Sequence, residues 1–547
     1  MSTIDSSLKP NDDDSALYDH ISLPPVREPE KTILESAGEK EAVGDDDLQM
    51  SNVEYSRILR KLDLSIIPYC SLLYLLSFLD RVNIGQASVA GLKGDLGISK
   101  GNAYAIALSV FFIGYIAVEV PSNLILNAIK PHRWIPIIMI AWSVVMILMG
   151  LVQSGRGLQA ARFFLGIAEG GLFPGINFML TCWYARRQQS LRIGIFFSGA
   201  TLAGAFGGVL AFGLKYIPFP SWKSFGDLPH QKNVPTPGGW RWIFIIEGLI
   251  TFICALPGWW LLVDFPADDN KILNPSETRK WNHFLAKSQG VTNANVPFSW
   301  GQVGQAFTDY RTYLYAVMYI SIAEPLYSLA LFTPTIIADL NFSGASANLL
   351  SVPPYVLGFI TTMTTAVIAD RIILRGPFIL FWSCFIIAGY GILISDVAPG
   401  VKYFGVFLTV AGVSPNVALA ISYVGANFGP LYVRATVMGI FFTIGNSAGL
   451  ISSNIYPSTE SPRFIKGHAI NLGFAALTFV STSIIMFVNW RNNKKRDAIS
   501  HAHPDGRDVD PARLDTDKEK KRWGYEGMTQ DQLLRLGDRH NAFRYII

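Results

Sequence analysis

Twelve apolar runs, each long enough to cross a lipid bilayer as a helix, constrain this chain more than any other feature. A helix needs about 20 mainly apolar residues to span the hydrocarbon core of a membrane. Charged residues make up only 16% of the chain, against about 25% in ordinary soluble domains. The sequence therefore predicts an all-α integral membrane protein. The expected transmembrane helices are residues 64–88, 103–126, 134–153, 158–183, 191–215, 241–264, 311–339, 347–370, 377–396, 402–427, 433–456 and 468–490.

The runs form an internal duplication of six spans, a hydrophilic connector and six more spans. This layout predicts two six-helix bundles around a central cavity. An even number of spans places both ends of the chain on one side, and basic residues beside the first and last spans favour the cytoplasm for that side. The expected parts are a disordered acidic tail (1–58), an N-terminal bundle (59–264), a central cytoplasmic loop (265–310), a C-terminal bundle (311–491) and a cytoplasmic tail (492–547).

Several classes of function lack their sequence motifs. The chain has no G-x-x-x-x-G-K-[ST] phosphate loop and no H-E-x-x-H metal motif. Its net charge of +4 is not the signature of a nucleic-acid-binding protein. We therefore expect no enzymatic activity, no cofactor, no metal and no nucleic acid, and any transport would draw its energy from a gradient. A glycosylation sequon at Asn341 is expected to be unused, because it lies close to the end of a span.

The fourth span carries two charges, Arg162 and Glu169, within RFFLGIAEGGLFPG. Seven residues are about two helical turns, so the two side chains point to nearly the same side, roughly 10 Å apart. A charge on the lipid face costs about 2.5–3.5 kcal/mol at mid-bilayer, so both are expected to face protein or water. Either they form a permanent bridge that braces the helix, or Glu169 exchanges a proton as its arginine neighbour changes between conformations. The glycines and Pro174 predict a bend after Glu169.

The first span carries Asp80 and Arg81. They form either a local ion pair at the membrane interface, or a protonatable carboxylate beside a cation that binds an anionic substrate. Ionisable residues inside a membrane usually serve function, which favours the second interpretation.

Several motifs together resemble one family. They are FLDRVNIGQA in the first span, Tyr115-x-x-x-Glu119-x-Pro121-Ser122-Asn123 in the second, RFFLGIAEGGLFPG in the fourth, WYARRQQSLRIG after it, GWRWIFIIEG in the sixth, ADRIILR after the eighth and GDRHNAFRYII at the C-terminal end. The chain resembles the major facilitator superfamily (MFS), and within it the anion:cation symporters of the fungal allantoate/nicotinate permease branch.

The resemblance implies roles for several residues. Asp80 and Glu169 would bind the coupling protons, Arg162 would link Glu169 to the cavity, and Arg81 and Tyr115 would contact the substrate. Three further residues would latch the cytoplasmic ends of helices: Asp370, Arg371 and Arg375.

Other polar residues in the spans have expected roles as well. Tyr327 and Asn446 are expected to complete the substrate pocket from the second bundle. Arg241 and Glu247, which follow the family pattern in the sixth span, are expected to pair with each other at the outer interface.

The expected function is uptake of a small organic anion, such as a nicotinate-, allantoate- or vitamin-like carboxylate, coupled to protons. The resemblance also implies a monomer in the plasma membrane. Two alternatives stay open: export of a metabolite by proton antiport, and a nutrient sensor that does not transport. The sequence does not choose the substrate.

Overall fold

The computed structural model describes residues 50–99, 101–185, 188–214, 217, 238–266, 271–289, 300–340, 344–429, 431–501, 520–521, 523–529, 536–541 and 543–547. All of them belong to one compact unit, Met50–Ile547. Residues 1–49, which make up most of the predicted disordered tail, and the sequon at Asn341 lie outside the described residues.

Twelve helical segments of the described residues are long and apolar enough to cross a membrane. This confirms the predicted all-helical, twelve-span fold. The membrane helices are α2 (Asn52–Ala87), α4 (Ala103–Ile129), α5 (Pro131–Met149), α6 (Gly155–Glu169) with α7 (Leu172–Trp183), α8 (Gln189–Leu214), α9 (Trp240–Ala255), α13 (Tyr310–Ala338), α15 (Val352–Ile372), α16 (Gly376–Ile394), α17 (Pro399–Asn427), α18 (Leu431–Asn446) with α19 (Ala448–Ser452), and α20 (Ile465–His501).

Shorter helices extend or connect these spans. They are η2 (Ser88–Leu92), α3 (Lys93–Asp95), α10 (Gly258–Leu261), α11 (Pro275–Gln289), α12 (Trp300–Thr308), α14 (Gly344–Leu350), η3 (Ser458–Glu460) and η5 (Gly537–Arg539).

The fourth span is broken where a bend was expected. Helix α6 ends at Glu169 and α7 begins at Leu172, with two glycines between them. Pro174 lacks the N–H that would continue the hydrogen-bond ladder to the carbonyl of Gly170. Glycine is also needed for close packing here, since a Cβ atom at Gly166 would lie only 2.0 Å from the carbonyl oxygen of Phe111 on α4. Glu169 therefore stands at the end of a helix held tightly against α4.

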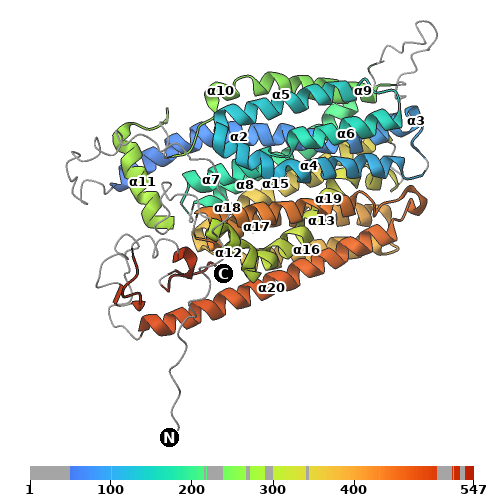
Figure 1. Cartoon of the computed structure of the whole chain (residues 1–547). Coiled ribbons are helices and arrows are strands. Elements are labelled where there is room, and N and C mark those ends of the chain that lie inside the picture. Colours follow the sequence, from blue (N-terminus) through green and yellow to red (C-terminus); the bar gives the residue numbers. More distant parts are fainter. Residues whose placement is uncertain are drawn as a thin grey trace, which may run out of the picture. The chain divides into compact units, whose positions relative to one another are not determined.

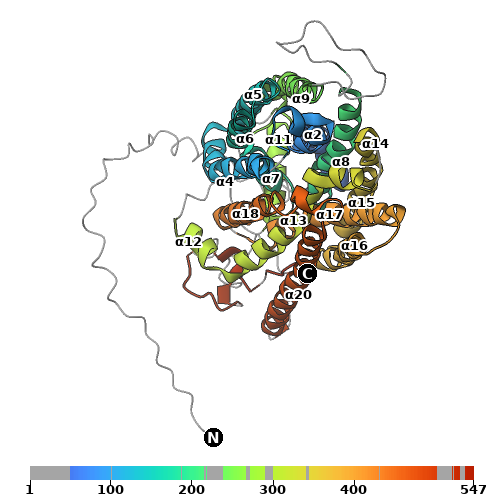
Figure 2. The same ribbon diagram turned by 90° about the vertical axis from the view of Figure 1, so that its right-hand side faces the viewer.

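The first six and last six spans form separate groups. Helices α2, α4, α5, α6 and α9 pack mainly among themselves, as do α13, α16, α17, α18 and α20, whereas α8 and α15 each pack on both groups. Figure 2 shows the two groups end-on, with blue to green helices on one side and yellow to red helices on the other. The groups meet where α8 packs on α15 and α17, where α2 packs on α13, and where α4 packs on α18.

We call the end of the helix assembly that holds Asn52 and His501 the tail end; it lies at the left of Figure 1. The predicted central loop contains α11 and α12, and α11 is joined to α2 there by ion pairs from Lys61 and Arg57 to Glu277, at 2.9 and 3.3 Å. Helix α20 continues to His501, ten residues beyond the charged boundary at Arg491.

The last described residues return to the tail end of the second group of helices. Asn427 Oδ1 accepts a hydrogen bond from the N–H of Ile546 at 2.8 Å, and the Arg375 N–H donates to the carbonyl of Ile547 at 3.0 Å. Asp538 accepts a hydrogen bond from Arg311 at the start of α13 at 2.7 Å. This part of the predicted cytoplasmic tail is packed onto the membrane helices.

Candidate functional site

A buried ion pair between α2 and α6 forms the centre of the candidate site. Arg81 Nη2 lies 2.5 Å from Glu169 Oε1, and the Ser77 hydroxyl donates to the same oxygen at 2.6 Å. Arg81 is 3% exposed and Glu169 is fully buried. Ser77 and Arg81 are four residues apart on α2, so they lie on one face of the helix and reach the carboxylate together.

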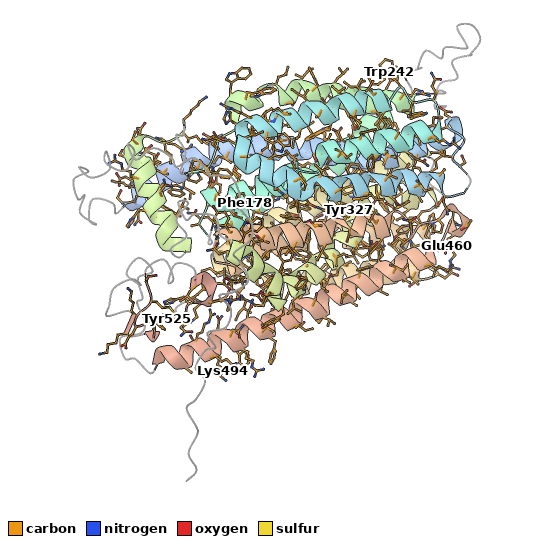
Figure 3. All side chains as sticks on the ribbon, in the orientation of Figure 1. Phe178, Trp242, Tyr327, Glu460, Lys494 and Tyr525 are labelled. Atoms are coloured by element: carbon orange, nitrogen blue, oxygen red, sulfur yellow. The ribbon has the colours of Figure 1, made fainter. Side chains whose placement is uncertain are left out.

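A chain of hydrogen bonds leads from this ion pair across to the second group of helices. Arg81 Nη1 donates to the Tyr327 hydroxyl on α13 at 3.4 Å, and that hydroxyl donates to Asn446 Oδ1 at 2.6 Å. Asn446 on α18 then donates to Glu119 Oε1 on α4 at 2.8 Å. Tyr327 lies near mid-depth in the helix assembly (Figure 3). The chain thus begins and ends on the first group and passes through two residues of the second.

Aromatic rings surround the Arg81 guanidinium. The guanidinium carbon lies 4.8 Å from the ring centre of Tyr115, 5.5 Å from that of Phe111 and 5.9 Å from that of Tyr327. Such cation–π contacts are worth about 2 kcal/mol or more when water is excluded. Tyr115 therefore faces Arg81, the cation predicted to bind the substrate. The buried hydroxyl of Tyr115 has no hydrogen-bond partner among the described residues.

Arg162 is the other cation of this region. It is fully buried, and its guanidinium carbon lies 4.5 Å from the ring centre of Phe111. None of its three side-chain nitrogens has a hydrogen-bond partner among the described residues. The described residues contain no ion pair between Arg162 and Glu169, because Glu169 pairs with Arg81. An unpartnered buried guanidinium is costly unless an anion comes to it.

Asp80 points away from its neighbour Arg81. Its Oδ2 atom accepts hydrogen bonds from Trp142 on α5 at 3.0 Å and from Thr251 on α9 at 3.2 Å. Successive helical residues point about 100° apart, so Asp80 faces α5 and α9 while Arg81 faces α6 and α13. The structure describes no ion pair between Asp80 and Arg81.

The predicted pairing of Arg241 with Glu247 is wrong. Arg241 donates to the carbonyls of Gly150 and Val152, whereas Glu247 accepts a hydrogen bond from Asn83 at 3.0 Å. Six residues are about 240° of rotation around a helix, so the two side chains leave α9 on different faces.

The residues expected to latch helix ends lie between the two groups at the tail end. Asp370 Oδ2 accepts a hydrogen bond from the N–H of Leu191 at 2.8 Å, and Arg375 Nε donates to the Ser190 hydroxyl at 2.9 Å. A carboxylate at the start of a helix satisfies a free N–H and interacts well with the helix dipole. Arg371 is exposed on the last turn of α15. Two of the three predicted residues thus contact the first turn of α8.

Five residues belong to the site but were not predicted as site residues: Ser77, Asn83, Phe111, Trp142 and Thr251. Part of the signal was periodic: Ser77 lies one turn from Arg81, and Thr251 lies one turn from Glu247. Nothing in the local sequence indicates that Phe111 lies between two arginines. Among the described residues, no group of three or more His, Cys, Asp or Glu side chains is placed to hold a metal ion.

Comparison with known proteins identifies the family. Residues 70–453 match the family model of the Major Facilitator Superfamily. An uncharacterized transporter of Schizosaccharomyces pombe is 35% identical over 86% of this chain and 94% of its own length. The high-affinity nicotinic acid transporter of Saccharomyces cerevisiae is 32% identical over 81% of this chain and 79% of its own.

Solved structures show the same fold. The proton:xylose symporter XylE, bound to 6-bromo-6-deoxy-D-glucose, superimposes with a TM-score of 0.58 at 14% identity, over 79% of this chain and 96% of that one. The family model covers well over half of the chain, and the fold and the relatives agree with it. This chain is a transporter of the major facilitator superfamily.

Proposed function

We propose that this transporter carries a small organic anion into the cell together with protons, and that it belongs to the anion:cation symporter branch of the superfamily. The Arg81–Glu169 ion pair is the observation that carries the proposal. A buried cation that already has an internal carboxylate partner cannot bind an external anion at full strength. It becomes available when that partner is neutralised, and a proton does this.

Coupling then follows from competition for Arg81. When Glu169 takes up a proton, its attraction for Arg81 is reduced to that of a neutral hydrogen bond, and the substrate carboxylate replaces it. When the substrate leaves, Arg81 returns to Glu169 and favours loss of the proton. By linkage, proton binding strengthens anion binding as much as anion binding strengthens proton binding.

Arg162 supplies a second positive charge to the same anion. Its guanidinium lies against the ring of Phe111, as that of Arg81 does, and its nitrogens have no acceptor among the described residues. Two guanidinium groups around one ring suit a carboxylate, because arginine binds carboxylates through paired N–H donors. The order we propose is proton first, then anion held by Arg81 and Arg162.

The hydrogen bonds from Arg81 to Tyr327 and from Asn446 to Glu119 connect the anion site to the second group of helices. An anion on Arg81 competes with the first of these bonds. This supports alternating access, in which the two groups rock about the site and Asp370 and Arg375 hold the tail end closed against α8.

The substrate we favour is an aromatic carboxylate of the nicotinate type. One support is the relative from Saccharomyces cerevisiae, which is named for nicotinic acid. The other is the lining of the site, since Tyr115, Phe111 and Tyr327 offer ring faces around the cation. The protein would act as a monomer in the plasma membrane, with the tail end in the cytoplasm.

The test is uptake of radiolabelled nicotinate by cells that lack their own transporter and express this one. We expect accumulation that an uncoupler abolishes. Glu169→Gln, which resembles the protonated glutamate, should lose accumulation but keep exchange of internal for external nicotinate. Glu277→Gln, in α11 outside the spans, is the matched control and should accumulate normally.

Three results would count against the proposal. Uptake that persists with an uncoupler excludes proton coupling. Wild-type accumulation by Glu169→Gln excludes the role of that carboxylate. Absence of uptake of nicotinate and of other labelled small carboxylates excludes a small organic anion as the substrate.

A further inference from the structure

A second buried polar cluster lies behind α2, on the side away from the Arg81–Glu169 pair. Asp80 accepts from Thr251 at 3.2 Å, and Asn83 donates to Glu247 at 3.0 Å. Asp80 and Asn83 are one turn apart on α2, and Glu247 and Thr251 are one turn apart on α9. The two helices are therefore joined by two neighbouring rungs, each with one carboxylate.

Helix α5 closes the third side of this cluster. The Trp142 indole donates to Asp80 Oδ2 at 3.0 Å, and the Asn83 amide also approaches the sulfur of Met146 at 3.7 Å. All four polar side chains of the two rungs, and Trp142, are fully buried. Neither carboxylate has an ion pair with a basic side chain among the described residues.

Three oxygen atoms in the cluster have no hydrogen-bond partner among the described residues: Asp80 Oδ1, Asn83 Oδ1 and Glu247 Oε1. The known donors occupy the other carboxylate oxygens, Asp80 Oδ2 and Glu247 Oε2. Two ionised carboxylates in such a place would be desolvated and would repel each other, which is very unfavourable. A positive charge bound by these unpartnered oxygens would stabilise the two carboxylates.

The charges that act on the cluster do not supply it. Asp80 is repelled by Glu169 and attracted by Arg162, both on α6, and Glu247 is repelled by Asp80. Helix α5 contributes an indole and a thioether, which carry no charge. Arg81 already pairs with Glu169, and Arg162 is attracted by Glu169 as well as by Asp80, so neither arginine neutralises both carboxylates of the cluster.

We infer that Asp80 and Glu247 form a second proton site that holds one proton between them. The inference deepens the proposed function, on which its role in coupling rests, and adds Glu247 to the transport machinery. Two nearby carboxylates commonly share one proton, since they cannot both ionise. A proton needs only two of the three vacant oxygens, whereas a metal ion such as Na⁺ would need more oxygen ligands than these three.

The proposed proton site and the anion site lie on different faces of the same helix, α2. Asp80 and Arg81 are adjacent in the chain, yet the first faces the α5–α9 cluster and the second faces the anion site. All members of the cluster lie on α2, α5 and α9, so the site moves as a unit with the first group of helices. The charge of this cluster influences the anion site through Arg162, because Arg162 interacts electrostatically with both Asp80 and Glu169.

Infrared titration of the purified protein in lipid nanodiscs tests this site without a substrate. Protonated carboxylic acids have a C=O band that disappears on ionisation. We expect one component of this band to be present in the wild type and absent from the Asp80→Asn/Glu247→Gln double variant. In either single variant this component should disappear at lower pH than in the wild type, because the repelling partner is gone.

Matched variants keep the test decisive. Glu324→Gln removes a buried glutamate of the second group and should leave this component unchanged. Trp142→Phe removes a donor to Asp80 and should move its loss to higher pH, which provides a second readout if Asp80→Asn does not fold.

Three outcomes would overturn the inference: survival of the component in the double variant, the same titration in Glu247→Gln as in the wild type, or loss of the component on adding Na⁺ at constant pH. The last would identify a sodium site. None of these depends on nicotinate, so failure of this site and failure of the proposed substrate are separable.

Discussion

Glu169 pairs with Arg81 of another helix, at 2.5 Å, and not with Arg162 of its own helix. The pair connects the first and fourth spans, and it leaves Arg162 buried without an acceptor among the described residues. The two arginines therefore differ in their contacts, and this difference can be measured.

Removing one partner of the ion pair should destabilise the protein strongly. Arg81→Ala leaves Glu169 buried without its cation, and we expect the free energy of unfolding to fall by about 3–5 kcal/mol. Glu169→Ala should cost a similar amount, and the double variant should cost less than the sum of the two. Denaturant unfolding of the purified protein measures all three. Additive effects would show that the two side chains do not interact.

Arg162→Met should be milder than Arg81→Ala. No hydrogen bond among the described residues is lost, although the contact with Phe111 and the attraction to Glu169 and Asp80 are removed with the charge, so stability should fall much less than in Arg81→Ala. Binding of nicotinate should weaken by roughly tenfold or more, which corresponds to about 1.4 kcal/mol. Thermal unfolding with and without nicotinate reports both effects. A loss of stability like that of Arg81→Ala would mean that Arg162 is already paired.

Asp370 and Arg371 form a natural comparison, because they are adjacent and only the first contacts α8. Asp370→Ala removes the acceptor for the Leu191 N–H and should cost about 1 kcal/mol at the start of that helix. We expect easier opening of the tail end, measured as faster labelling of a cysteine placed at Ser422, which contacts Ser190. Arg371→Ala should label at the wild-type rate. Equal labelling of the two variants would remove the latch role of Asp370.

The contact between α11 and α2 should depend on pH only in acid. Burial alone would raise the pKa of Glu277, but hydrogen bonds from Lys61 and the Asn274 N–H, together with the charge of Arg57, hold that pKa below its usual range. A carboxyl whose pKa is lower in the folded state stabilises it above the ordinary glutamate range, and this is lost as the pH falls through the lowered pKa.

Hydrogen exchange of the α11 amides, corrected for intrinsic rates, measures that contact. Protection should be constant around neutral pH and should fall in acid below the ordinary range of glutamate. Glu277→Gln should show weaker protection at neutral pH and little further loss in acid. A wild-type profile that loses protection near neutral pH would contradict the assignment.

Hydropathy was sufficient to predict the twelve spans, because a membrane helix has to be apolar over its whole length. The bend after Glu169 followed from local chemistry as well, since glycine and proline act on their own backbone. The predicted residues Arg81, Tyr115, Tyr327 and Asn446 lie together in the structure.

The partners of the charged residues could not be predicted in the same way. Which face a helix turns toward which neighbour depends on packing across the whole assembly, so Asp80 and Arg81 separate although they are adjacent. Arg241 and Glu247 were paired because both are charged and close in sequence, but their helical positions place them on different faces. The charged residues could be recognised from the sequence, but their contacts could not be predicted from proximity along the chain.

Two hydrogen bonds, from Arg81 to Tyr327 and from Asn446 to Glu119, also affect the rate of transport. If the groups of helices rock, both bonds open in every cycle. At about 1 kcal/mol net for each bond, they add about 2 kcal/mol to the barrier, which slows turnover roughly thirtyfold. Tyr327→Phe removes the first of these bonds and lowers that barrier by about 1 kcal/mol, so this variant is expected to turn over faster than the wild type.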